Sequence, residues 1–160
     1  MSTCQLVRGA HSVGEYNAHL VFTPAYRRAV FTDDLVRELT LGYLLQGAQR
    51  LGVHIAAIEF GPDHVHLFVE NWRRYAPAEL ARRLKGYASY MMRRGHAALF
   101  EHMLWGHKFW TASYFFRTVG AVTSTTVKHY IEESQTKHWK AIEQQTLLGY
   151  SKEPAGFSPR

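Results

Sequence analysis

The sequence predicts an α+β protein with a ferredoxin-like β-α-β-β-α-β order, followed by an additional C-terminal helix. Two observations predict this order. Short segments typical of strands, rich in apolar residues and mostly alternating, lie at 16–23, 53–60, 64–70 and 113–119. Longer segments with apolar residues at helical spacing lie between them, at 33–51 and 77–94. In this arrangement an antiparallel sheet carries two helices on one face, and the order by itself indicates no function.

Length and composition are typical of one globular domain. At 160 residues the chain can bury a core, and hydrophobic residues make up 46% of it. Cys4 is the single cysteine, which excludes a disulfide framework and a cysteine-based zinc site. We expect an N-terminal arm at 1–14, one domain at 15–140 and a tail at 141–160. Without a secretory signal or an apolar run of about 20 residues, we expect a cytoplasmic protein with no membrane partner.

Local residue types predict the first strand and helix. In the strand at 16–23, His19 faces one side and Leu20 and Phe22 face the other. Thr32 is the predicted N-cap of the helix, because the two acidic residues after it suit a helix N-terminus. The apolar positions of this helix are Leu35, Leu39, Tyr43, Leu44 and Leu51.

Turn and capping residues separate the remaining elements. Gly52 ends the first helix, and the Gly-Pro-Asp sequence at 61–63 is a turn that joins the second and third strands into a hairpin. Pro77 suits the first turn of the second helix. A third helix begins after Thr123 or Ser124.

His64 and His66 in the third strand are the first candidates for a functional site. Side chains alternate faces along a strand, so both imidazoles project from one face, roughly 6–7 Å apart at the backbone. The opposite, core-facing side carries Val65, Leu67 and Val69. Such a pair can share one metal ion or bind one phosphate. The alternative is an ordinary solvent-facing pair, and the spacing alone leaves both open.

Positive charge indicates a polyanionic partner. The formal net charge is +6, and neutralising the phosphates of a nucleic acid releases its counterions. The candidate DNA-binding residues are Arg82, Arg83 and Lys85 in the second helix and Arg27 and Arg28 in a basic turn. Unpaired bases can stack on an aromatic group that comprises Trp105, Phe109, Trp110 and Tyr114. The alternatives are a solvated helix face for the cations, and a core or dimer interface for the aromatic residues.

Tyr130, expected on the third helix, is the candidate nucleophile. A helical tyrosine is usually core or interface, but its hydroxyl can attack a phosphodiester and form a covalent intermediate. A metal ion on His64 and His66 would orient the phosphate and neutralise its charge. Mg²⁺ prefers oxygen ligands and imidazoles suit Mn²⁺ better, so the metal stays open. Two imidazoles leave most of the coordination shell unfilled, which requires a further protein ligand.

Four motifs, taken in order, resemble the single-tyrosine HUH transposases of the insertion-sequence 200/605 type. They lie at 61–67 (GPDHVHL), 84–86 (LKG), 104–110 (LWG, then FW) and 127–132 (VKHYIE). The resemblance runs from Gly14 to Lys137, which is most of the chain.

The resemblance implies a reaction and its partners. Such enzymes are small homodimers that recognise single-stranded DNA hairpins at the ends of a mobile element. They cleave and rejoin the strand through a 5′-phosphotyrosine intermediate with a divalent metal, Mg²⁺ or Mn²⁺, and use no nucleotide cofactor. Carried over to matching positions, His64 and His66 are metal ligands, Tyr130 is the nucleophile and Lys85 lies near the site. The tyrosine helix of one subunit often completes the site of the other. A cytoplasmic, nucleoid-associated prokaryotic protein is implied.

One position departs from the family pattern. The family usually places a glutamine, the third metal ligand, four residues after the tyrosine, and that position here is Ser134. Gln135 points about 140° away from Tyr130 at about 100° per residue, so it reaches the site if the helix carries a one-residue π-bulge. We assign Gln135 as the third ligand, with Glu133 and Ser134 as alternatives.

The departure keeps other functions open. One alternative is that this protein has lost its catalytic activity and binds DNA hairpins without cutting them. A third alternative is a transposase that acts on repetitive extragenic palindromes, although the long basic tails of those relatives are not evident here.

Overall fold

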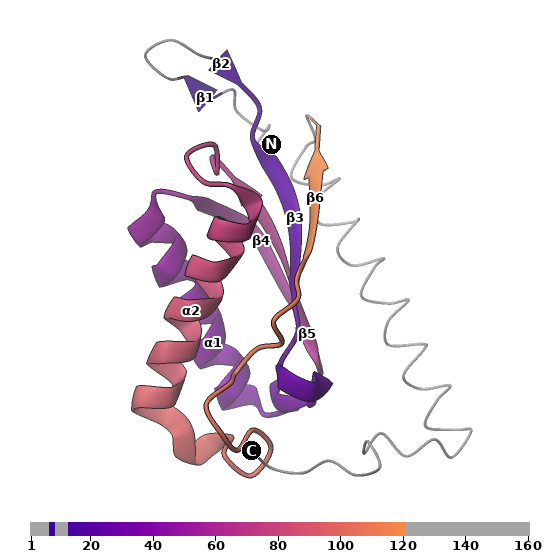
Figure 1. Cartoon of the computed structure of the whole chain (residues 1–160), viewed down its shortest axis with the longest axis vertical. Helices are drawn as coiled ribbons and strands as arrows, with labels where there is room; N and C mark the ends of the chain where they lie inside the picture. Colours follow the sequence, from indigo (N-terminus) through magenta and orange to yellow (C-terminus); the bar gives the residue numbers. More distant parts are fainter. Residues whose placement is uncertain (1–6, 9–12, 121–160) are drawn as a thin grey trace, which may run out of the picture.

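The computed structural model describes residues 7–8 and 13–120, and its main sheet has four strands (Figure 1). These are β3 (Asn17–Phe22), β4 (His54–Gly61), β5 (His64–Glu70) and β6 (Phe115–Val119). Two helices, α1 (Asp34–Leu51) and α2 (Pro77–His96), lie side by side over one face of the sheet. Single turns of 3₁₀ helix lie at Ala25–Arg27, Val30–Thr32 and Ala97–Leu99.

The strand order confirms the predicted fold. The sheet runs β4-β5-β3-β6, and every neighbouring pair is antiparallel. The first and third strands of the β-α-β-β-α-β order are therefore central, which is the split β-α-β topology. A second, two-stranded sheet pairs β1 (Val7–Arg8) with β2 (Val13–Gly14) inside the predicted N-terminal arm. Strands of two residues are too short to produce an alternation that the sequence could reveal.

The N-cap of α1 is Asp33, and the prediction of Thr32 is wrong. The Asp33 carboxylate accepts hydrogen bonds from the backbone N–H groups of Leu35 and Val36, at 2.9 and 3.0 Å. The Thr32 hydroxyl instead donates to the carbonyl of Ala29 at 2.7 Å. The Thr32 side chain therefore closes a local turn, and the carboxylate of Asp33 caps the helix.

Four predicted apolar positions of α1 are confirmed, because Leu44 is buried and Leu39, Tyr43 and Leu51 pack against the core. The most deeply buried side of the helix differs from the prediction at its first position. It runs through Val36, Thr40 and Leu44, whereas Leu35 is 53% exposed. Apolar side chains at both 35 and 36 fit a helical repeat, and packing selects between them. Gly52 ends the helix as predicted, with a left-handed φ of 71°.

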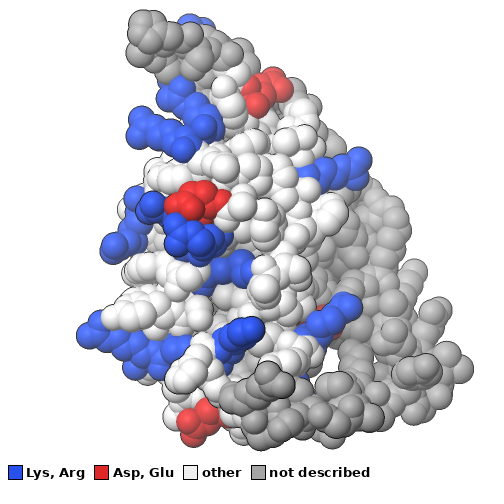
Figure 2. All heavy atoms as spheres, viewed as in Figure 1, with Lys and Arg blue, Asp and Glu red and all other residues white. Residues whose placement is uncertain are grey.

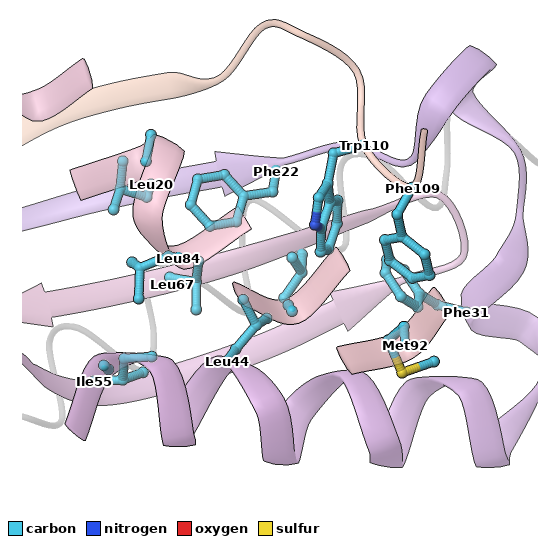
Figure 3. Close-up of a cluster of buried hydrophobic side chains, with 14 of the residues drawn as sticks. Leu20, Phe22, Phe31, Leu44, Ile55, Leu67, Leu84, Met92, Phe109 and Trp110 are labelled. Atoms are coloured by element: carbon cyan, nitrogen blue, oxygen red, sulfur yellow. The ribbon is translucent and has the colours of Figure 1, made fainter. Parts of the chain in front are cut away.

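The core lies between the sheet and the helices (Figure 3). Burying large apolar side chains there is the main favourable term of folding, at roughly 1.5–3 kcal/mol for each side chain. The largest fully buried side chains include Leu20 and Phe22 of β3, Leu67 of β5, Leu44 of α1, and Leu84 and Met92 of α2.

The segment that leads into β6 is fastened to α2 and to the end of β3. The Lys85 ammonium donates to the carbonyls of Thr111 and Ser113, at 2.6 and 3.0 Å. The Trp110 indole donates to the carbonyl of Lys85 at 3.1 Å. The Thr111 N–H donates to the carbonyl of Thr23, just beyond β3, at 2.8 Å. These bonds fix where β6 begins along its partner strand.

Several predicted features lie outside the described residues. They include the third helix, the tail at 141–160, and the site residues Tyr130, Glu133, Ser134 and Gln135. In the part of the chain that the structure describes, no helix is long and apolar enough to cross a membrane.

Candidate functional site

β5 presents two different buried faces. Val65, Leu67 and Val69 pack into the core, as predicted. His64 and His66 project from the opposite face of the sheet, where they are only 4% and 7% exposed. The centroids of the two imidazole rings lie 4.8 Å apart, and the ring planes are perpendicular. The histidines form a compact buried pair and not two solvent-facing side chains.

His64 is held by the turn that precedes it. Its Nδ1 lies 3.0 Å from Oδ1 of Asp63, which is also buried. Gly61 lies opposite His64 in the β4–β5 ladder, and a Cβ at that glycine would lie 2.5 Å from Nδ1 of the ring. Glycine at position 61 therefore provides the space in which the imidazole lies against β4.

His66 is paired with a histidine of the neighbouring strand. Its Nδ1 lies 2.9 Å from Nε2 of His19 on β3, and the planes of the two rings are 19° apart. Burial of His19, and to a lesser extent the positive charge of Arg117 on β6, lowers the pKa of His19 from 6.5 to about 4. His19 is therefore a neutral imidazole at pH 7.

A turn of unusual backbone conformation brings Arg27 to this site. Tyr26 and Arg27 have φ angles of 58° and 53°, a left-handed region that residues other than glycine seldom occupy. The Arg27 guanidinium lies 3.8 Å from Oδ2 of Asp63, and its side chain stays 66% exposed. Arg28 lies over the ring of Trp105, at 5.3 Å from its centroid. The turn thus places a solvent-accessible cation next to the carboxylate that contacts His64.

The predicted DNA-binding residues Arg82 and Arg83 lie on the other side of the sheet, on α2. Both donate to the carboxylate of Glu79, at distances of 2.6 to 3.1 Å. With Arg50 and Tyr87 they line an open pocket between the two helices. In Figure 2, Lys and Arg side chains lie along the same side of the molecule as the helices in Figure 1, with acidic side chains among them.

Lys85 is buried, unlike the neighbouring arginines. Its exposure is 9%, its ammonium donates to two backbone carbonyls, and burial lowers its pKa. Phe109 and Trp110 likewise lie in the core, which selects the core alternative for these two members of the aromatic group. The structure gives Lys85 a role in holding the segment before β6, and its contact with DNA stays a prediction.

The described residues supply two imidazoles and no complete metal site. Within residues 7–8 and 13–120, no group of three or more His, Cys, Asp or Glu side chains is arranged to hold a metal ion. Gln135, the predicted third ligand, lies outside these residues, as do its alternatives Glu133 and Ser134.

Two neighbours of the histidine pair were not singled out from the sequence. The sequence predicts a turn at Asp63, and the position of this residue directly before His64 is the only signal of its contact with that ring. His19 was placed on the correct face of its strand, but its contact with His66 depends on the pairing of β3 with β5, which joins residues 47 positions apart. The predicted fold places these two strands side by side, but the sequence does not specify the register that brings His19 to His66.

Comparisons with known proteins agree with the fold and the motifs. A family model described as "Transposase IS200 like" matches residues 12–134. The ISDra2 transposase TnpA of Deinococcus radiodurans is 29% identical over 133 residues, which cover 83% of this chain and 94% of that protein. The transposase for insertion sequence element IS200 of Salmonella typhimurium is 29% identical over 131 residues, covering 79% of this chain and 84% of that one.

A solved structure gives the same result. The crystal structure of a Deinococcus radiodurans protein described as a transposase superposes with a TM-score of 0.63 at 28% identity. The superposition covers 79% of this chain and 96% of that one. The match to the family model spans most of the sequence, including the histidine pair and Tyr130. The chain belongs to the IS200-like transposase family.

Proposed function

We propose that the protein cleaves and rejoins single-stranded DNA through a covalent bond to Tyr130, with a divalent metal ion on His64 and His66. Membership of a transposase family makes the chain a DNA-cleaving enzyme in general. The observation that carries the finer proposal is the buried histidine pair, whose ring centroids lie 4.8 Å apart on one face of β5.

The donor set of the pair fits a divalent metal ion. Imidazole nitrogens are common ligands of divalent transition metals, and both rings come from one rigid strand, with Gly61 leaving room for the ring of His64. Bound there, Mg²⁺ or Mn²⁺ would act as a Lewis acid on the phosphate and would orient it. Gln135 is the proposed third ligand, with Glu133 and Ser134 as alternatives.

The proposed reaction exchanges one phosphate ester for another. The Tyr130 oxygen attacks phosphorus, the bond from phosphorus to the 3′ oxygen breaks, and the phenolic proton is transferred to the released 3′ oxygen. The 5′-phosphotyrosine bond conserves the free energy of the phosphodiester bond that was broken. A 3′-hydroxyl can then attack it and rejoin a strand, so no nucleotide cofactor is needed.

The proposed substrate is a single-stranded DNA hairpin, bound by a homodimer whose active sites are shared between subunits. Arg27 supports this proposal most directly, because it is exposed and lies 3.8 Å from Asp63, beside the histidine pair. The formal net charge of +6 favours a polyanion. Arg28, Arg82 and Arg83 are further candidates for contacts with phosphates.

Adduct formation tests the proposal. The full chain is incubated with single-stranded DNA carrying a palindrome from next to its gene, with Mn²⁺ or Mg²⁺, and is analysed on a denaturing gel. We expect a protein–DNA adduct with the wild type and with Tyr90→Phe, a control at a tyrosine that is 56% exposed on α2. Tyr130→Phe should form no adduct and should still shift the hairpin on a native gel.

The same experiment separates the alternatives. An adduct that persists in Tyr130→Phe would rule out this nucleophile. A wild-type chain that shifts the hairpin but forms no adduct with either metal would support a DNA-binding protein without cleavage.

A further inference from the structure

We infer that Asp63 and His19 are positioning residues, which hold the imidazoles of His64 and His66 in one tautomer, with the proton on Nδ1 and the lone pair on Nε2. The observation behind this inference is that each Nδ1 has its own buried partner, at 3.0 Å for His64 and at 2.9 Å for His66. The inference rests on the proposed function for its metal, whereas the tautomers are properties of the metal-free chain.

Asp63 determines the tautomer of His64. An aspartate carboxylate only accepts hydrogen bonds, so the nitrogen that faces it must donate. That nitrogen is Nδ1, and a neutral imidazole carries a single N–H. Nε2 of His64 is then the nitrogen with the lone pair. The second oxygen of Asp63 faces Arg27 at 3.8 Å, so the two carboxylate oxygens have separate partners.

His19 can pair with His66 in two ways, because each neutral imidazole has one donor and one acceptor. If His19 donates, the remaining proton of His66 lies on Nε2, and that nitrogen has no lone pair for a metal ion. If His66 donates from Nδ1 to Nε2 of His19, its own Nε2 carries the lone pair. We assign the second arrangement, because only this one leaves Nε2 of His66 with a lone pair for the proposed metal ion.

Rigid surroundings hold both contacts. His19 and His66 lie on adjacent strands of one antiparallel ladder, and Asp63 lies in the turn at its end. The N–H of Phe31 donates to the carbonyl of Pro62 at 3.1 Å, which fastens that turn. Partners of this kind fix the orientation of a metal-binding histidine and raise the basicity of its coordinating nitrogen.

The tautomers can be measured without metal or DNA. Long-range ¹H–¹⁵N correlation spectra of the ¹⁵N-labelled full chain, recorded at pH 7.5 with a chelator, distinguish a proton on Nδ1 from one on Nε2. We expect both His64 and His66 to carry the proton on Nδ1. A proton on Nε2 of either ring would overturn the assignment for that histidine.

Substitution of the partners measures their effect on the proposed site. In Asp63→Ala and in His19→Phe, which keeps an aromatic ring, Mn²⁺ should bind roughly 10- to 100-fold more weakly. The matched controls are Asp34→Ala and His54→Phe, at exposed positions that lie in ion pairs elsewhere, and these should bind Mn²⁺ like the wild type. His19→Gln should recover part of the affinity, because its amide oxygen can accept a hydrogen bond from the Nδ1–H of His66.

Failure of this inference is distinguishable from failure of the proposed function. Wild-type Mn²⁺ affinity in both Asp63→Ala and His19→Phe would overturn the positioning role. Absence of Mn²⁺ binding at the two histidines of the wild type would contradict the proposed metal site. The tautomer spectra, which require neither metal nor a variant, would still decide whether Asp63 and His19 orient the rings.

Discussion

The two central strands, β3 and β5, bury apolar side chains on the face towards the helices. On the other face they bury the rings of His19, His64 and His66 together with Phe68. On the helix side, Leu20 and Leu67 are fully buried in the core. On the opposite side, His19 and His66 are almost as inaccessible, at 3% and 7% exposure. Burial of a polar ring is unfavourable unless the ring is hydrogen-bonded, so the second face depends on specific partners. The comparison indicates that apolar burial stabilises the helix side, whereas the opposite side also holds the polar rings of the proposed metal site.

The largest effect on stability is expected on the helix side. Leu67→Ala should lower the free energy of unfolding by about 2–5 kcal/mol, because a fully buried leucine leaves a cavity between the sheet and the helices. Urea denaturation followed by circular dichroism measures this loss. A change under about 1 kcal/mol would contradict the assignment of this face to the core.

On the histidine side, the same truncation should affect the reaction. His66→Ala removes a proposed metal ligand, and a Lewis acid contributes several kcal/mol to such a transition state, so cleavage should slow on the order of 100-fold or more. Single-turnover cleavage of a hairpin substrate in Mn²⁺ measures the rate. Cleavage at the wild-type rate would remove His66 from the site.

Lys85 is a buried polar side chain on the helix side, where most of the buried side chains are apolar. Lys85→Met should lower the free energy of unfolding by about 1–3 kcal/mol, because two carbonyls lose their donor. Burial lowers the pKa of Lys85 in the folded state, so the unfolded state binds the proton more tightly. The contribution of Lys85 to stability should therefore grow as the pH rises towards about 10.4, the ordinary lysine pKa.

Denaturation of the wild type and Lys85→Met at pH 8 and pH 10 measures this dependence. The difference in unfolding free energy between the two proteins should be larger at pH 10. A difference that shrinks with pH would contradict the sign of the shift.

The smallest expected effect tests the space that is left for His64. In Gly61→Ala the new Cβ would lie 2.5 Å from Nδ1 of His64, so the ring must move, and Mn²⁺ affinity should fall on the order of 10-fold. Gly42→Ala is the matched control, because a Cβ in that part of α1 meets nothing within 4 Å and should stabilise the helix by about 0.5–1 kcal/mol. Equal affinity in both variants would show that position 61 does not constrain the ring.

Local sequence patterns predicted the elements of the fold because strands and helices have fixed periods. Alternation placed Val65, Leu67 and Val69 in the core, and the same period placed His64 and His66 together on the other face. Position-specific packing was less predictable. Leu35 and Val36 both fit the helical pattern, and only the docking of α1 on the sheet buries the second.

Contacts between distant segments account for what the sequence did not reveal. His19 meets His66 through the register of β3 against β5, which no local pattern encodes. Lys85 was assigned to a basic surface, yet the segment before β6 covers it and binds its ammonium. Asp63 lies in a Gly-Pro-Asp sequence that is typical of a turn, and its contact with His64 depends on the direction of both side chains.

We propose above that His64 and His66 together hold a divalent metal ion, and this binding can be measured directly. Electron spin-echo envelope modulation of Mn²⁺ bound to the full chain reports nitrogen atoms coordinated to the metal. Binding by both histidines predicts couplings from two imidazoles in the wild type and from one in His66→Ala. Mn²⁺ that binds the wild type without any nitrogen coupling would contradict it.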